Sequence, residues 1–283
     1  MQDFLAKHAV FTVDDLDQYL SVSGSGKINT RKSLLAYYRN KGRIVQVRRG
    51  LYLTVPLGED PSTNPVEPYL IAAKLQPDAV LSYHTALEYH GKAYSTFNRF
   101  YYSSRHKTPL FKFRNFEFIS VQVPLNLRLK EKDLFGVAYR NRLGMDLKVT
   151  TLERTFVDVL NRPGLAGSLE EIWRSLESIE FFDLDQVIEY VHLLNNATTA
   201  AKVGFFLDQH RDVLMVDDYY LNTLRQLCPS QPHYFNREKR KGSQLVKDWN
   251  LLVPTELINR TWEELQRNWG QVLKYYLLQD IIL

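Results

Sequence analysis

The sequence has one cysteine, Cys228, among 283 residues, which excludes an internal disulfide framework and a zinc site built from several cysteines. We interpret this thiol as a buried side chain without a chemical role. No apolar run approaches the roughly 18 residues that a membrane-spanning helix needs. The N-terminal stretch MQDFLAKHAVFTVDDLDQYL places acids where a signal peptide has its apolar centre. The sequence therefore predicts a cytoplasmic protein that does not contact a membrane.

Motifs that mark common enzymes are missing as well. The chain has neither the glycine-rich loop of P-loop proteins nor the GxSxG turn of serine hydrolases. His84 and His90 are six residues apart on one predicted helix, so they point to different faces instead of forming the i, i+4 pair of a metal-binding helix. We interpret both as structural histidines. We expect a protein that is not an enzyme, with no catalytic residue, no metal and no cofactor.

Acidic residues are absent from one long segment. Residues 27–55, KINTRKSLLAYYRNKGRIVQVRRGLYLTV, contain eight lysines and arginines and no Asp or Glu, whereas the whole chain has 36 basic and 32 acidic residues. A basic segment of this kind is the electrostatic signature of nucleic-acid binding. The simpler alternative is a solvated basic face without a partner.

The first 56 residues have the pattern of a small helical domain with a hairpin. We expect a short helix around residues 4–8, an extended segment at 10–12, and a helix that Thr12 caps. A glycine-serine turn follows, and a further helix begins with Asn29 or Thr30 as its cap and ends near residue 40, before Gly42. Two strands, RIVQV and LYLTV, then flank a turn that contains Gly50.

This order of helix, helix and hairpin is that of a winged helix-turn-helix, in which the second helix of the pair enters the DNA major groove. Arg31 and Lys32 would lie at the start of that helix, and Arg48 and Arg49 at the tip of the hairpin. The predicted DNA-binding residues are Lys27, Thr30, Arg31, Lys32, Tyr37, Arg39, Lys41, Arg43, Arg48 and Arg49.

A proline-rich stretch separates this domain from the rest. PLGEDPSTNPVEP, residues 56–68, has four prolines and no apolar periodicity, which predicts a linker over 57–68. Residues 69–283 then form a larger domain, with alternating strand patterns up to about residue 165, including a hairpin over VAYRNRLGMDLKVTT, and mainly helical spacing over 166–283. In the helical part, we expect Asp183 and either Thr198 or Thr199 to be N-caps. The predicted fold class is α+β: an N-terminal winged helix-turn-helix over 1–56, followed by a larger mixed α/β domain with a helical C-terminal part.

Residues 99–142 form a second basic region, with ten basic and three acidic residues among many aromatic ones. Such mixtures bind partners or stack on single-stranded nucleic acid, but a half-buried sheet with a basic outer face gives the same pattern. We consider six residues as partner-binding candidates: Arg99, Arg105, Lys107, Lys112, Arg114 and Arg154. For Arg154 we favour a structural role, in which it pins its helix to the sheet.

Five segments in order resemble the AbiEi family of antitoxins: AVFTVDDL, LLAYYRNKGRIVQVRRGLYLTVP, DAVLSYHTALEYHGKAYS, VTTLERTFVDVLNRP and EEIWRSLESIEFFDLDQVIEYV. The resemblance extends over about residues 8–255. It implies a winged-helix domain that represses its own operon and a second domain that counters a nucleotidyltransferase toxin encoded alongside, in bacterial abortive infection and phage resistance. By position, Arg31, Lys32, Arg48 and Arg49 fall in the DNA-binding unit. The motifs of the second domain contain Tyr83, His84, Gly91, Glu153, Arg154 and Asp158.

The resemblance implies two partners: double-stranded promoter DNA, which we expect to carry inverted repeats, and the cognate toxin, countered by direct contact or functionally. We expect a monomer in solution. One alternative is a ligand-sensing transcriptional regulator without a toxin, whose aromatic-rich sheet would line a pocket. Another is a nuclease that holds a metal through Glu117 and Asp146, near Lys112 and Lys148.

Overall fold

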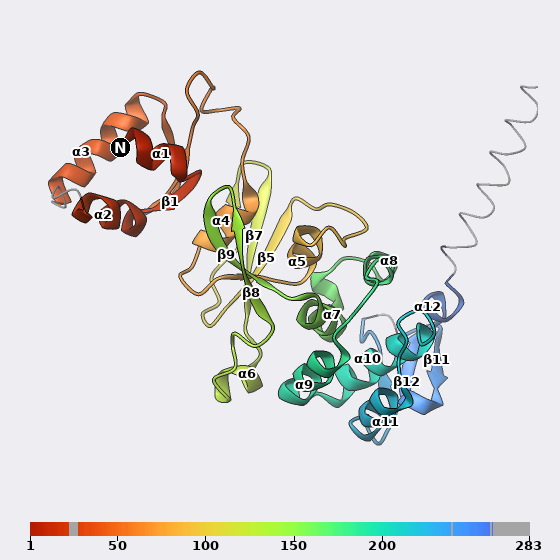
Figure 1. Ribbon diagram of the computed structural model, residues 1–283. Helices are drawn as coiled ribbons and strands as arrows, with labels where there is room; N and C mark the ends of the chain where they lie inside the picture. Colours follow the sequence, from red (N-terminus) through yellow and green to blue (C-terminus); the bar gives the residue numbers. More distant parts are fainter. Residues whose placement is uncertain (23–27, 239, 261, 263–283) are drawn as a thin grey trace, which may run out of the picture. The chain divides into compact units, whose positions relative to one another are not determined.

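The computed structural model describes residues 1–22, 28–238, 240–260 and 262. Its described part is a mixed α+β fold that divides into two compact units (Figure 1). The first unit contains residues 1–91 and 95–155, and the second contains residues 92–94 and the chain from 156 onward. The N-terminal module, residues 1–55, and the six-stranded sheet therefore belong to the same unit.

The N-terminal module has three helices and a three-stranded sheet. Its elements are α1 (Gln2–Lys7), β1 (Val10–Thr12), α2 (Val13–Val22), α3 (Ile28–Asn40), β2 (Ile44–Arg48) and β3 (Leu51–Thr54). The strands pair antiparallel in the order β1-β3-β2. The predicted helices and hairpin are thus present, but Asn29 and Thr30 lie inside α3 instead of capping it.

Local chemistry sets the ends of these helices. The Thr12 hydroxyl accepts a hydrogen bond from the N–H of Asp15 at 3.1 Å, and the Asp15 carboxylate accepts one from the N–H of Thr12 at 2.7 Å. This reciprocal pair satisfies two backbone donors where α2 begins. Gly42 ends α3 with a φ of +66°, a conformation that glycine adopts without strain, as predicted.

The rest of the first unit is built on a mixed six-stranded sheet in the order β6-β7-β5-β4-β9-β8. The pairs β5–β7 and β4–β9 are parallel, and the others are antiparallel. Strands β8 and β9 form the hairpin predicted for VAYRNRLGMDLKVTT, and β6 and β7 form another hairpin where alternating strands were predicted. The elements in chain order are α4 (Pro68–Lys74), β4 (Val80–Leu81), α5 (His84–Tyr89), β5 (Arg99–Ser104), β6 (Phe111–Phe113), β7 (Phe116–Gln122), α6 (Leu125–Leu129), β8 (Val137–Arg142) and β9 (Met145–Thr150).

The second unit is mainly helical, with a small sheet near its end. Helix α7 (Leu152–Asn161) contains the division between the units and leads into η1 (Pro163–Leu165), α8 (Leu169–Glu177), α9 (Leu184–Leu194), α10 (Ala197–Gln209) and α11 (Asp218–Gln226). Strands β10 (His233–Tyr234), β11 (Ser243–Val246) and β12 (Leu251–Pro254), with η2 (Lys247–Trp249) and α12 (Thr255–Asn259), complete it. Within the described residues, no helix is long and apolar enough to cross a membrane.

Polar caps begin the helices of the second unit. Asp183 caps α9 as predicted, because its side chain accepts the N–H of Gln186. The prediction that Thr198 or Thr199 caps α10 is wrong. Asn196 is the cap, and its side chain accepts a hydrogen bond from the N–H of Thr199 at 3.2 Å. Asparagine is a stronger N-cap than threonine, so the helix begins earlier than expected.

Candidate nucleic-acid interface

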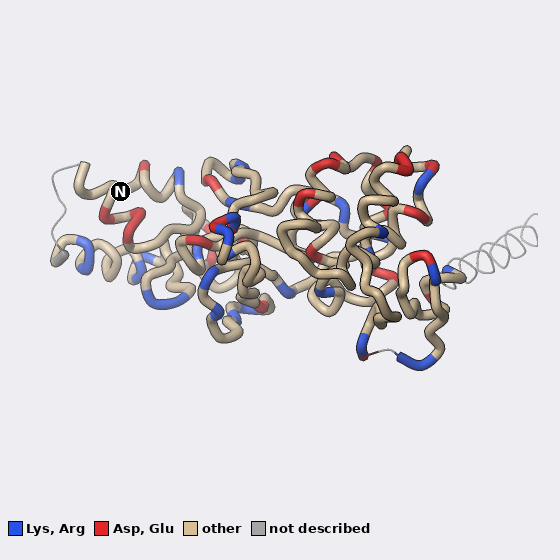
Figure 2. The backbone as a smooth tube through the Cα atoms, turned by 90° about the horizontal axis from the view of Figure 1, so that it is seen from below, with Lys and Arg blue, Asp and Glu red and all other residues tan. Residues whose placement is uncertain are grey.

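The exposed face of α3 gathers the predicted basic side chains. Lys32, Tyr37 and Arg39 are exposed on this helix, Lys41 follows its end, and α3 itself has no acidic residue. In Figure 2 the helix that follows the grey trace of residues 23–27 carries blue and no red segments. The Lys41 ammonium lies 5.9 Å from the centre of the Tyr37 ring. The opposite face packs through Leu34, Leu35 and Tyr38.

The helical spacing adds polar neighbours that the sequence prediction did not include. Asn29, Ser33, Ala36 and Asn40 are exposed as well. Together with Lys32 and Tyr37 they recur every three or four residues, so they share one side of the helix. The signal was available in the sequence, because counting threes and fours from Lys32 selects these positions. This face combines small and amide side chains with cationic ones.

Three predicted DNA-binding residues are less available. Arg31 is half-buried and forms an ion pair with Asp17 of α2. The Arg43 guanidinium donates to the carbonyl oxygen of Val55 at 3.0 Å, and Thr30 is half-buried. Lys27 lies outside the described residues.

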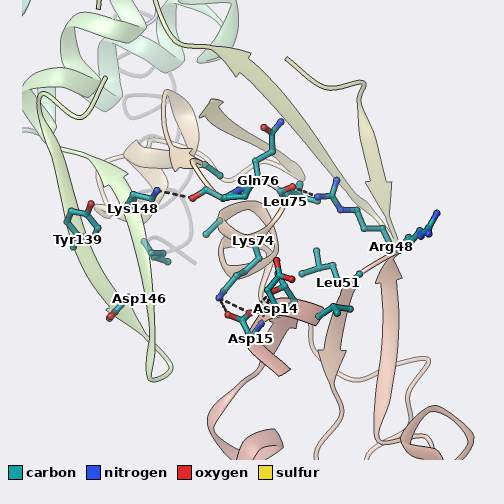
Figure 3. A pocket seen from close by; sticks show the side chains of 18 residues that line it. Asp14, Asp15, Arg48, Leu51, Lys74, Leu75, Gln76, Tyr139, Asp146 and Lys148 are labelled. Carbon is teal, nitrogen blue, oxygen red and sulfur yellow. Dashed lines mark hydrogen bonds and ion pairs between the residues drawn. The ribbon is translucent and has the colours of Figure 1, made fainter. Parts of the chain in front are cut away.

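The two arginines at the β2–β3 turn differ in their surroundings. Arg49 is exposed, beside Gly50, whose φ is +83°. The half-buried Arg48 instead donates to the carbonyl oxygen of Leu75, directly after α4, as Figure 3 shows. A carbonyl at the C-terminal end of a helix is a favourable acceptor for a cation. Arg49 is therefore the more accessible of the two cations.

Arg48 takes part in a wider contact between the module and the sheet-containing part of its unit. One face of the module's sheet packs on α1–α3 through Phe11, Ile44 and Tyr52. The other face contributes to a second hydrophobic cluster that it shares with α4 and β9. Its members include Val10, Val47, Leu51 and Leu53 from the module, with Leu70, Ile71, Leu75, Met145 and Leu147. Both faces of the module's sheet are thus covered.

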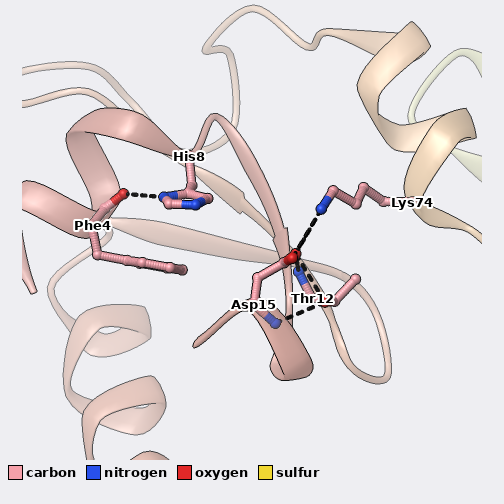
Figure 4. A network of polar contacts seen from close by, with 5 residues as sticks. All are labelled: Phe4, His8, Thr12, Asp15 and Lys74. Atoms are coloured by element: carbon pink, nitrogen blue, oxygen red, sulfur yellow. Dashed lines mark hydrogen bonds and ion pairs between the residues drawn. The ribbon is translucent and has the colours of Figure 1, made fainter. Parts of the chain in front are cut away.

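A half-buried ion pair lies beside this cluster. The Lys74 ammonium donates to both oxygens of Asp15, at 2.9 and 3.0 Å, and each side chain is 24% exposed (Figure 4). Burial opposes ionisation of Asp15, but hydrogen bonds from Thr12 and Lys74 outweigh it and hold the pKa of the carboxyl below its usual value. Asp15, which forms the reciprocal pair with the cap residue Thr12, therefore also binds α4. Nothing in the local sequence indicates this pairing.

A cavity of about 530 Å³ lies at the same place, between the start of α2, the β2–β3 turn, the end of α4 and the β8–β9 hairpin (Figure 3). Arg48, Lys74 and Lys148 each donate to a group on its wall, the last to the carbonyl oxygen of Pro77 at 3.1 Å. The aromatic residues Phe100 and Phe118 of the large sheet belong to the hydrophobic cluster and do not line this cavity.

The partner-binding candidates are held mostly by contacts within the chain. Glu117 forms ion pairs with Arg99 at 3.0 Å and Lys112 at 2.6 Å across the β6–β7 side of the sheet. These cations lower the pKa of its carboxyl, with the hydrogen bond from Lys112 as the larger cause. Lys107 is exposed. Arg105 pairs with Asp133, and Arg114 donates to the carbonyl oxygen of Pro61 at 2.8 Å.

Arg154 is a buried structural residue, 1% exposed. Its guanidinium donates to the carbonyl oxygens of Asp133 at 2.7 Å and Phe135 at 2.6 Å, and so fixes the loop before β8. A Cβ on Gly136 would lie 2.8 Å from that of Arg154, which explains why glycine is required there.

The histidines and the cysteine also have structural surroundings. The ring of the buried His84 stacks on Phe97 with centroids 3.7 Å apart. His90 makes a 2.7 Å hydrogen bond with the carbonyl oxygen of Thr150, and burial lowers its pKa. Burial raises the pKa of the Cys228 thiol to about 11, so it is protonated at neutral pH. Across the described parts of the chain, no group of three or more His, Cys, Asp or Glu side chains could hold a metal ion.

Comparisons with known proteins find a family resemblance in the N-terminal module. Residues 1–55 match the model of a family described as a transcriptional regulator, AbiEi antitoxin. No curated protein matches the chain. The crystal structure of the RV2827C protein from Mycobacterium tuberculosis is similar, with a TM-score of 0.54, 17% sequence identity and 88% of each chain covered. At this identity the likeness concerns the fold alone.

The match covers the segment that holds α1–α3 and the β2–β3 hairpin. The resemblance of the sequence from there to about residue 255 stays a prediction. The predicted resemblance to the AbiEi antitoxin transcriptional regulators is thus confirmed for residues 1–55.

Proposed function

We propose that the protein is the antitoxin of a toxin-antitoxin pair and represses its own operon by binding promoter DNA. The exposed face of α3 carries the proposal: Lys32 and Arg39 extend from a helix without acidic residues, in a module of a family of transcriptional regulators. In this proposal the module is a winged helix-turn-helix. Helix α3 enters the major groove, and Arg49 at the hairpin tip contacts a phosphate.

Because Arg49 is exposed and Arg48 is bound within the chain, the two hairpin arginines provide a test of this proposal. A mobility-shift titration of the chain against its own upstream promoter, at several salt concentrations, measures affinity and salt dependence. We expect Lys32→Ala and Arg49→Ala each to weaken binding and to reduce the slope of log K against log salt by about 1, since each removes one phosphate contact. Arg48→Ala is the matched control, because its guanidinium binds the Leu75 carbonyl. We expect its slope to match that of the unaltered protein.

Two results would refute this assignment. Equal affinity for the promoter and for random DNA of the same length would refute the proposal that the protein represses its own operon. A salt slope that falls in Arg48→Ala but not in Arg49→Ala would mean that the hairpin binds DNA in a different conformation. A promoter with inverted repeats would hold one monomer on each repeat.

The toxin-countering half of the proposal concerns the rest of the chain. We propose a nucleotidyltransferase encoded beside this chain as the cognate toxin, countered directly or through a shared substrate. Co-expression of the two should restore growth that the toxin alone stops. The Lys32→Ala variant should restore growth equally well, because α3 serves DNA. Loss of rescue in that variant would indicate that the toxin binds the same face.

A further inference from the structure

A second cavity, of about 400 Å³, lies in the first unit where strands β5 and β7 end. These strands are parallel, and Arg105 and Val123, the residues directly after them, both line the cavity. Ligands of open sheets bind beyond the carboxyl ends of parallel strands. The volume is within the range of small-molecule sites. Both location and size therefore suit a metabolite.

The charges on the wall indicate the class of ligand. The charged side chains that line the cavity are the cations Arg105, Lys148 and Arg154 and the carboxylates Asp78, Glu131 and Asp133. The two signs are equal in number. A ligand with charge of one sign would be attracted by half of these groups and repelled by the other half. A neutral ligand with separated positive and negative charges can match both.

Asp133 offers an acceptor that the described residues do not use. Its Oδ2 pairs with Arg105, but its Oδ1 is buried and has no hydrogen-bond partner in the described part of the chain. A buried carboxylate oxygen without a donor destabilises the folded state. A positively charged nitrogen on a ligand would supply that donor and stabilise the site.

Lys148 provides the complementary group. The residue is half-buried, and its ammonium donates to the carbonyl oxygen of Pro77, a neutral acceptor, at 3.1 Å. An ammonium group has three donors, so two remain for a ligand carboxylate. The buried Arg154 adds positive charge at the wall and holds the backbone of Asp133 in place.

We propose that this cavity binds a free α-amino acid as a zwitterion. A small turn of the Asp133 side chain, which is 14% exposed, brings Oδ1 to the ligand ammonium, and the ligand carboxylate accepts from Lys148. The site lies apart from α3, so the proposal does not depend on DNA binding.

Thermal melting of the full chain with single L-amino acids at millimolar concentration finds the ligand, and calorimetry then gives its Kd. We expect at least one amino acid to raise the melting temperature. Asp133→Asn and Lys148→Met should each weaken binding about tenfold or more, because each removes one charge partner. Each variant is compared with its own ligand-free melting temperature, so a loss of stability does not mimic a loss of binding. Lys247→Met, at an exposed lysine of the second unit, is the control and should bind normally.

Two analogues of the best ligand separate the two charges. The N-acetyl derivative lacks the ammonium and the amide derivative lacks the carboxylate, and both should fail to bind. Binding of either analogue as tightly as the parent amino acid would overturn the assignment. Unchanged binding of the amino acid by Asp133→Asn and Lys148→Met would overturn it as well. Absence of stabilisation by every standard amino acid would overturn it too.

Discussion

Breaking the ion pair between Asp15 and Lys74 tests whether the N-terminal module is held on α4. A double-mutant cycle with Asp15→Asn and Lys74→Met removes the charges and leaves an oxygen at position 15 that can still accept from the N–H of Thr12. Exposed pairs contribute up to about 1 kcal/mol, and breaking a fully buried pair costs about 3–5 kcal/mol. Because both side chains are 24% exposed, we expect a coupling free energy of about 1–2 kcal/mol.

Urea unfolding of the full chain gives the four free energies of the cycle at neutral pH and again near pH 3. In the folded state, the hydrogen bonds from Thr12 and Lys74 outweigh burial and lower the pKa of Asp15 from its ordinary value of 3.8. Its stabilisation is therefore present above the unfolded pKa and is lost as the pH falls through the folded pKa. The coupling should shrink as the pH is lowered toward 3. A coupling below about 0.3 kcal/mol at neutral pH, or one that does not change with pH, would refute the reasoning.

Two further changes concern the second unit. Gly204→Ala should destabilise the protein by about 1–3 kcal/mol in thermal melting, because a Cβ there would lie 2.0 Å from the Trp249 ring, whereas Gly164→Ala, with nothing within 4 Å, should be close to neutral. Burial lowers the pKa of Lys202 to about 8 from 10.5, so the folded protein loses this proton at a lower pH than the unfolded chain. The free energy of unfolding therefore rises with pH between these two values. Lys202→Met should remove that rise, about 3 kcal/mol, in urea unfolding at pH 7 and pH 10; an unchanged pH dependence would contradict it.

Short-range chemistry explains what the sequence could predict. The Thr12 cap and the Gly42 stop depend on residues within one helical turn or on the conformational freedom of glycine, and both are found where expected. The prediction of the α10 cap was wrong because Asn196 and Thr198, only two positions apart, are both residues that cap helices. The stronger preference of asparagine for the N-cap position decides between them, and the helix begins after Asn196.

The features that the sequence did not predict depend on contacts between residues far apart in the chain. Lys74 and Asp15 are 59 positions apart in the sequence, so no local pattern joins them. The same holds for Arg48 and the Leu75 carbonyl, where the tertiary fold gives one arginine an acceptor and leaves Arg49 exposed. The sequence predicted a basic face, and the structure determines which of its cations are available.

A linker of the kind predicted after the module would let the module move freely. The shared hydrophobic cluster instead holds the module on α4 and β9. Val10 and Val47 of the module are buried together with Leu75 and Met145, so separating them would expose apolar surface at about 25 cal/mol for each Å². The ion pair of Asp15 and Lys74 adds to that cost. Since α3 packs on the opposite face of the same small sheet, its orientation follows that of α4. If α3 binds DNA as proposed, a partner or ligand that shifts α4 would therefore change how α3 meets DNA through packed side chains, without touching the exposed face of α3.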